Sequence, residues 1–408
     1  MKKEKKQKLP IALKIIIIVL SVLIALMLIL TVVFFSLRSS GKKSLYSKVE
    51  DAQPDFGSFG EIETEETTTE STVGEKETTK SAADNNDNKE TGSNSENVTG
   101  EQTETSTASV ESTTADNSGY VYQSGDVNFN GHVYRYNQDI LTFLVLGIDR
   151  ETEVPVVDAN TNYLKGGQSD TILLMVMNPH DKNISVVAVN RNTMTDIDMY
   201  DSAGNYVRTA KAQICIQHGY GDGGKLSCER ARQTVSELFY NLPIHGYVSI
   251  GMGAVPLLND AVGGVEITLP NDSWELGLSA GTTVRLNGEQ AYNFVHNRNK
   301  QEFDSTTARL NNQKVYLSAF MNQVFEATKN DITFPVSLYQ KLSNYIVTDI
   351  GIDEMSYLAS ELVGYSVGSA KIYTVPGQTV MGNKFEEFYV DENALKQQML
   401  EIFYEVVK

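Results

Sequence analysis

The chain has 408 residues, with 52 acidic and 34 basic side chains and a formal net charge of −18 at pH 7. This acidic balance argues against nucleic acid as a partner, because surfaces that bind nucleic acid are basic. The two cysteines are too few for a disulfide scaffold or a structural zinc site.

A lysine-rich segment and a long apolar run open the chain. The run from Ile15 to Phe35 is interrupted only by one serine and one threonine. As a helix it would be roughly 32 Å long, enough to cross the core of a bilayer. The basic flank favours an N-terminus on the inside. We therefore predict a cytoplasmic tail at 1–14, a single transmembrane helix at 15–37 in the cell membrane, and all later residues outside the cytoplasm.

The next segment has the composition of a disordered chain. Between Glu61 and Gly119 there is no aromatic residue, no leucine and no proline. Such a segment cannot bury enough apolar surface to offset its ordering entropy. We predict that residues 38–120 form a disordered acidic linker, a spacer spanning roughly 45 to 50 Å. An extracellular folded domain would then occupy residues 121–408.

Strands and helices alternate in this folded part. Residues 141–148 are apolar almost throughout, which is typical of a strand covered on both faces. Residues 171–177 and 184–189 are joined by a turn-rich segment and predict an antiparallel hairpin. The further predicted strands are 247–250, 265–269 and 371–375, and the predicted helices are 226–240, 288–296, 305–328, 353–364 and 392–406. This order predicts an α/β fold with a mixed central sheet between helix layers.

Two local features bear on chemistry. Cys215 and Cys228 are thirteen positions apart, and in an exported domain we expect them to pair, with two buried free thiols as the alternative. A disulfide closing such a loop would stabilise the fold by roughly 3 kcal/mol. The segment from Gly219 to Lys225 imitates a phosphate-binding loop, but Leu226 stands where a metal-binding hydroxyl is required. We interpret it as a glycine-rich turn before a helix.

Charged and polar side chains follow or open several of the apolar elements. They are Asp149, Asp170, Arg191, Arg298, Arg309 and Gln313. Carboxylates together with arginines suit a divalent metal and a multiply charged phosphate held at one edge of a sheet. Arg309 and Gln313 are four apart, so on a helix they share one face and can reach the same ligand.

These residues fall within seven segments of the chain, which are LVLGIDR, SDTILLMVMNP, VAVNRNTMTDI, QICIQHGYGDGG, IHGYVSIGMGAVPLLNDAVGGVEITLP, LNGEQAYNFVHNR and ARLNNQ. The succession resembles the LytR-CpsA-Psr family of cell-wall ligases. The resemblance implies an α/β/α sandwich whose apolar cavity takes a polyprenyl chain. It also implies transfer of a glycopolymer, such as a wall teichoic acid or a capsule, from a polyprenyl-pyrophosphate carrier to peptidoglycan, with pyrophosphatase side activity.

The resemblance also implies roles for individual residues. Asp149 and Asp170 match the two aspartates that hold Mg²⁺ at the pyrophosphate. Arg191 matches the arginine of the PRDT-like segment, beside the phosphates. We expect these three residues to be the indispensable catalytic set. The further phosphate-binding positions are Arg298 of the RxR motif, Arg309 and Gln313 of the RxxRQ motif, and Gln168, which replaces an arginine.

The chain departs from the family pattern mainly by losing positive charge. The neutral or less basic substitutes are Gln168, His296, Asn312 and Gln213, and Asn192 replaces an aspartate. These losses support a rival of another class, a non-catalytic module that binds a polyprenyl-linked glycan and presents it to another enzyme. An adhesin would suit the Thr-rich linker but leaves the acid and arginine positions unexplained.

Overall fold

The computed structural model describes residues 31–49, 52–56, 121–154, 166–299, 301–362, 364–365 and 371–408. The predicted cytoplasmic tail and residues 15–30 of the predicted membrane span therefore lie outside the described part. Among the helices within it, none is both long and apolar enough to cross a membrane.

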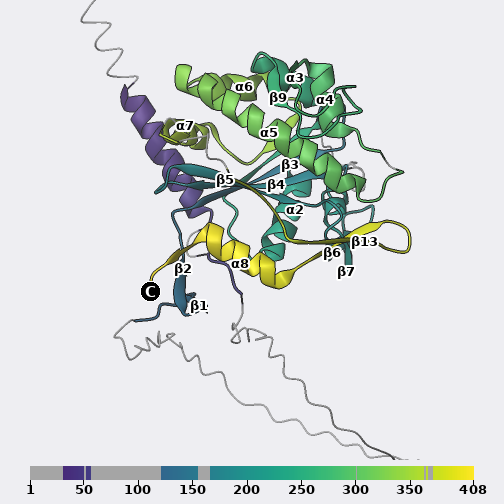
Figure 1. Cartoon of the computed structure of the whole chain (residues 1–408). Helices are drawn as coiled ribbons and strands as arrows, with labels where there is room; N and C mark the ends of the chain where they lie inside the picture. The colour runs from purple at the N-terminus through teal and green to yellow at the C-terminus, as the bar shows by residue number, and fades with distance from the viewer. Residues whose placement is uncertain are drawn as a thin grey trace, which may run out of the picture.

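The central sheet is mixed, as the sequence predicted. Within the described ranges it has six strands, in the order β11 (Ile346–Thr348), β8 (Gly246–Gly251), β3 (Leu141–Ile148), β4 (Ser169–Asn178), β5 (Asn183–Val189) and β12 (Lys371–Thr374) (Figure 1). β3 runs antiparallel to β4 and parallel to β8, and the expected hairpin of β4 and β5 is present. The parallel neighbours of β3 and β5 are reached through long connections that carry the helices.

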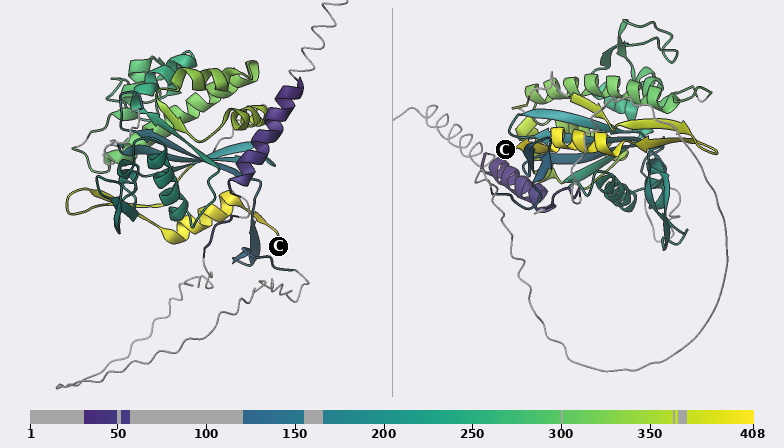
Figure 2. Two further views of the ribbon diagram at one scale, coloured as in Figure 1. Left: turned by 180° about the vertical axis from the view of Figure 1, so that it is seen from behind. Right: turned by 60° about the horizontal axis from the view of Figure 1, so that its bottom comes forward.

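Helices cover both faces of this sheet (Figure 2). Leu144 and Leu146 of β3 pack in one apolar cluster with α2 (Lys225–Leu238) and α8 (Glu392–Phe403). Leu141 and Phe143 pack on the other face with α5 (Ser305–Asn330) and α7 (Ile352–Leu362). Alternate side chains of a strand point to opposite faces, so an apolar run of this kind needs cover on both sides. The α/β/α arrangement is confirmed.

Smaller elements surround the sandwich. A third apolar cluster joins α5 to α3 (Val255–Ala261), α4 (Gly288–His296), β9 (Val265–Thr268) and β10 (Thr283–Leu286). Two hairpins that the sequence did not predict are β6 (Met194–Tyr200) with β7 (Tyr206–Gln213), and β13 (Gly377–Met381) with β14 (Glu386–Val390). The remaining helices and strands are β1 (Val127–Phe129), β2 (His132–Tyr136), β15 (Tyr404–Val406), α6 (Phe334–Leu342) and three short 3₁₀ helices, η1 (Ile214–Ile216), η2 (His218–Tyr220) and η3 (Met252–Ala254).

The prediction of a disordered linker is wrong at its start, whereas the end of the membrane span at residue 37 stays a prediction. Residues 31–47 form one continuous helix, drawn in purple beside α7 in Figure 1. Leu45 of this helix is fully buried in the cluster that contains α5 and α7. The linker prediction failed here because one buried leucine and several polar contacts fix a segment that composition alone describes as polar. Residues 57–120 of the predicted linker lie outside the described part.

The predicted disulfide is also wrong, because Cys215 and Cys228 are both free and buried. The two thiols have different neighbours. The Cys215 sulfur lies 3.0 Å from Nη2 of Arg191, whereas the Cys228 sulfur lies 3.8 Å from Nε2 of His218. The alternative of two buried free thiols holds.

Two buried histidines make the stability of the fold depend on pH. Burial lowers the pKa of His218 and of His245 from 6.5 to about 4. As the pH falls below 6.5 the unfolded chain takes up protons that the native state does not, so stability present above that pH is lost toward pH 4. By pH 5 we expect a loss of about 2 kcal/mol for each histidine. Urea unfolding between pH 7.5 and 5 checks this, and a flat profile would contradict it.

Candidate functional site

The two aspartates lie at the same end of neighbouring strands. The Asp149 amide donates a hydrogen bond to the Gln168 carbonyl at 3.0 Å, just beyond the last pairs of β3 and β4. Gly147 pairs with Thr171 and Ile148 with Ser169, so Asp170 is the extra residue of a β-bulge. A bulge redirects the side chain that it leaves unpaired. The fold thereby brings both predicted metal-binding carboxylates to one corner of the sheet.

Asp170 lies between two arginines from distant parts of the chain. Its Oδ1 is 3.1 Å from Nη1 of Arg191, which follows β5, and its Oδ2 is 3.0 Å from Nη1 of Arg309 on α5. The Arg309 side chain is only 5% exposed and that of Asp170 is 12% exposed. An ion pair this deep is weakly screened by solvent, so the three groups hold each other in place.

This cluster carries more positive charge than its one bridging carboxylate neutralises. Burial lowers the pKa of Arg309; Asp170 opposes that shift, while Arg191 and Arg298 add to it by charge repulsion. For Arg191, burial also disfavours the charged form, but Cys215, Asp170 and Asp149 outweigh it and the pKa of Arg191 is raised. In a chain with a net charge of −18, such a local excess of guanidinium groups is the signature of an anion site.

Two donors of the arginine cluster have no partner. Nε of Arg191 and Nη2 of Arg309 are buried and form no hydrogen bond with any described residue. An unpaired buried donor costs about 1 to 3 kcal/mol, more when it is charged. Guanidinium groups are suited to bind phosphate oxygens through paired N–H donors. The vacant donors therefore fit a phosphate that is held against both arginines.

Arg298 and Gln313 play supporting parts in the described structure. Nη1 of Arg298 donates to the hydroxyls of Ser305 and Thr306, both at 3.2 Å. Nε2 of Gln313 donates to the carbonyl of Val295 at 3.1 Å, which ties α5 to α4. Gln313 thus lies on the same buried helix face as Arg309, as predicted. Its contact with a phosphate stays a prediction.

Gln168 and Cys215 contact Nη2 of Arg191, whose Nη1 pairs with Asp170. Nη2 of Arg191 contacts both Oε1 of Gln168 and the sulfur of Cys215. The amide that stands in place of the expected arginine therefore orients a second arginine. Sequence reasoning missed the role of Cys215, because nothing in the segment QICIQ marks its thiol as part of a charged cluster.

A cavity of about 690 Å³ opens beside Arg191. Gln168 and Arg298 line it together with Lys211 of β7 and Lys384, which joins β13 to β14. Glu386 also lines it and accepts a hydrogen bond from the Asp304 amide at 2.8 Å. The hairpin of β13 and β14, for which we predicted no role, thus forms one wall of the site.

The residues present fit Mg²⁺ as two carboxylate ligands of an ion whose other ligands are water and phosphate. In the described part of the chain no three His, Cys, Asp or Glu side chains come together that could hold a metal ion. Mg²⁺, however, is usually held by one or two carboxylates, several waters and substrate phosphates. The Asp149 carboxylate is exposed and forms no hydrogen bond within the described ranges, and each Asp170 oxygen retains a lone pair. Asp149 and Asp170 could therefore hold such an ion together with a phosphate.

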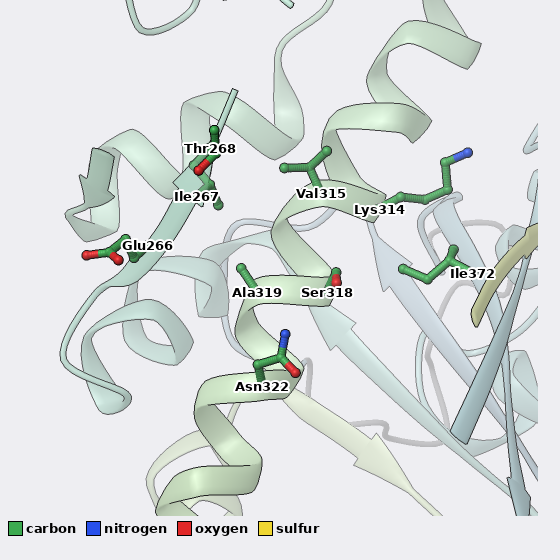
Figure 3. Close-up of a pocket in the computed structure, with 9 residues that line it drawn as sticks. All are labelled: Glu266, Ile267, Thr268, Lys314, Val315, Ser318, Ala319, Asn322 and Ile372. Atoms are coloured by element: carbon green, nitrogen blue, oxygen red, sulfur yellow. The ribbon is translucent and has the colours of Figure 1, made fainter. Parts of the chain in front are cut away.

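A second hollow, of about 430 Å³, lies between β9 and α5 (Figure 3). Glu266 and Lys314 are its only charged lining residues, and Lys314 donates to the Thr374 hydroxyl at 3.1 Å. None of the predicted site residues lines this hollow. It does not bear the chemistry of the arginine cluster.

Comparison with known proteins places these observations in context. The family model LytR_cpsA_psr matches residues 75–402. A polyisoprenyl-teichoic acid–peptidoglycan teichoic acid transferase TagU of Enterococcus faecalis is 25% identical over 69% of this chain and 85% of its own length. The protein of the same name from Oceanobacillus iheyensis is 27% identical over 56% of this chain and 64% of its own. The crystal structure of protein gbs0355 from Streptococcus agalactiae has the same fold, with 17% identity, a TM-score of 0.52, and coverage of 65% of this chain and 86% of that one.

Proposed function

Since this chain belongs to the LytR-CpsA-Psr family, we propose that it transfers a glycopolymer from a polyprenyl-pyrophosphate carrier to peptidoglycan. The observation that carries the proposal is the cluster of Arg191 and Arg309 around Asp170, with buried donors left free for a phosphate. The names of the relatives support a teichoic acid or related polymer as cargo.

The proposal includes the position of the domain. The apolar run at 15–35 is proposed to anchor the chain in the cell membrane, with its N-terminus inside and its folded domain outside. A domain in that position meets both partners, the lipid-linked donor in the bilayer and the peptidoglycan above it. Nucleic acid is not proposed as a partner, because the chain is acidic.

The reaction is a displacement at phosphorus. A hydroxyl oxygen of the peptidoglycan sugar forms a bond to the glycan-bearing phosphorus, the bond to the bridging oxygen breaks, and the polyprenyl phosphate leaves. The proton of the hydroxyl is released to water or to the leaving phosphate. Arg191 and Arg309 would stabilise charge on the transferred phosphoryl group, in the manner of other phosphoryl transfers. When bound by Asp149 and Asp170, Mg²⁺ would neutralise charge on the leaving phosphate. Arg298 would hold the donor from the cavity side.

The test is transfer by the full chain in detergent or nanodiscs, with a polyprenyl-pyrophosphate glycan as donor and peptidoglycan as acceptor. We expect transfer with Mg²⁺ and a loss of about 10²-fold after chelation with EDTA, restored by Mg²⁺, because the leaving phosphate then carries uncompensated charge.

The rival binding module gives a different result in the same assay. It is favoured by the neutral Gln168, which stands where the family pattern has an arginine. A binder would retain the intact pyrophosphate lipid for hours in the presence of Mg²⁺ and peptidoglycan. That outcome, with tight donor binding, would replace the proposed transfer.

A further inference from the structure

We infer that residues 31–49 dock the domain directly on the outer surface of the bilayer in a fixed orientation, with the phosphate headgroups of anionic phospholipids as partners of Lys42 and Lys43. The inference rests on the membrane anchoring proposed above. It goes beyond it, because an anchored domain could equally stand at the end of a long spacer.

The helix at 31–47 is packed too closely on α7 to be a loose tether. Gly41 is buried, and a Cβ atom placed on it would lie 2.1 Å from the carbonyl oxygen of Asp353. Only glycine permits this approach of the two backbones. One turn further along, Leu45 is fully buried against the face of the sheet that carries α7. Figure 1 shows the helix, in purple, alongside α7.

Two carboxylates of α7 pair with side chains of this helix. Glu354 is only 2% exposed; it accepts a hydrogen bond from Ser44 at 2.7 Å and pairs with Lys48 at 3.1 Å. Glu361 pairs with Arg38 at 2.6 Å. Removal of the helix would break these buried pairings of Glu354, and the loss of one partner of a buried ion pair is costly. The segment is therefore an integral part of the folded domain.

The chain is fixed to the same domain a second time before the acidic segment begins. The Asp55 amide donates to the Tyr240 carbonyl at 2.7 Å. The Phe56 ring lies 5.2 Å from that of Tyr240 and shares an apolar cluster with Val127, on the far side of the acidic segment. Residues 57–120 thus connect two points of one domain. Their length cannot set the distance between the domain and the helix at 31–47.

The exposed side chains of the helix change along its length from apolar to basic, as they do where a chain passes from the acyl chains of a bilayer to the headgroups. Val32 and Phe35 are 68% and 58% exposed, and they continue the apolar run of the sequence. Arg38, Lys42 and Lys43 follow, and they line a cavity of about 510 Å³ that also includes Tyr46 and Tyr357. Apolar side chains followed by cations and tyrosines match the order from acyl chains to headgroups. Arg38 is already paired with Glu361, so Lys42 and Lys43 are the cations that give this chain of net charge −18 a local attraction to an anionic surface.

Gly41→Ala tests the packing of the 31–47 helix on α7, which fixes the orientation of the domain. The helix itself is not weakened, because alanine favours helix formation while its Cβ collides with α7. The full chain is placed in phosphatidylglycerol nanodiscs, and hydrogen exchange is measured over α7. We expect exchange there to rise at least tenfold in Gly41→Ala and to stay unchanged in the control Ser36→Ala, whose side chain is exposed. Equal protection of α7 in both variants would mean that the helix is not held on α7, and the fixed orientation on the bilayer would be overturned.

Transfer from two kinds of glycopolymer donor, one in the bilayer and one in solution, distinguishes an effect on orientation from an effect on the reaction itself. Gly41→Ala should lower transfer from a donor embedded in the nanodisc about fivefold or more, and leave transfer from a short-chain, water-soluble donor within twofold of wild type. Equal loss on both donors, or on neither, would overturn the positional role. If the wild type transfers from neither donor, the proposed function fails, while the exchange data still decide whether the helix is docked.

The headgroup contact has its own test in the double variant Lys42→Gln, Lys43→Gln. Wild-type residues 38–49 should exchange at least threefold more slowly in phosphatidylglycerol than in phosphatidylcholine nanodiscs, and the double variant should lose this difference. The same protection in both lipids for the wild type would exclude anionic headgroups as the partner. Protection that appears only when the pyrophosphate donor is added would assign the basic side chains to the donor instead.

Discussion

Arg191→Ala is expected to lower the rate of glycopolymer transfer by about 10³-fold, the scale at which a guanidinium contributes to phosphoryl transfer. This corresponds to about 4 kcal/mol of lost stabilisation of the transition state. Arg191 stands at the centre of the site, since it pairs with Asp170, contacts Gln168 and Cys215, and keeps a buried Nε free for a ligand. Steady-state transfer with the bilayer donor measures the effect.

Two further variants show whether the effect is local and specific. Arg208→Ala removes an exposed arginine of β7 and should leave the rate within twofold of wild type. Arg191→Lys keeps the charge but loses the planar donor pair, so it should recover only a small part of the rate. Transfer by Arg191→Ala at more than half the wild-type rate would remove Arg191 from the mechanism.

The sequence predicted those parts of the fold in which a local pattern is strong. The apolar run of β3, the hairpin of β4 and β5, and the helix at 288–296 lie where expected. The pairs β6–β7 and β13–β14 were missed because one strand of each, β7 and β13, is largely exposed, and their partners are mostly half-buried with few buried apolar side chains. The helix at 31–47 was misread beyond residue 37, since what fixes it is its contact with α7, distant in sequence.

Like the fold, the candidate site was predicted from the sequence in part. Asp149, Asp170, Arg191 and Arg309 were identified from their positions at element ends, and the structure brings them together. The orienting contacts of Cys215 and the wall formed by Lys384 could not be predicted, because they depend on where long loops and a late hairpin fold back. The functional roles of all these residues stay predictions until the variants are measured.

Asp170→Asn and Asp149→Asn should separate structure from chemistry at the corner of the sheet. Loss of the Asp170 charge leaves the buried guanidinium groups of Arg191 and Arg309 facing each other without a shared counter-charge, so we expect the free energy of unfolding to fall by about 3 kcal/mol. Asp149 is exposed and forms no hydrogen bond within the described ranges, so Asp149→Asn should change stability by less than about 0.5 kcal/mol. Both variants should lose Mg²⁺-dependent transfer by about 10²-fold.

Inorganic pyrophosphate shows whether Asp170→Asn loses stability because Arg191 and Arg309 lack a shared anion or because the fold is damaged in general. In Asp170→Asn the anion can take the place of the missing carboxylate between Arg191 and Arg309, so added pyrophosphate should raise the melting temperature of this variant more than that of the wild type, in the absence of metal. In Asp149→Asn, where the Asp170 pairs remain, the rise should equal that of the wild type. An equal response in all three proteins would mean that the two arginines do not form a phosphate site, and the proposed chemistry would lose its physical basis.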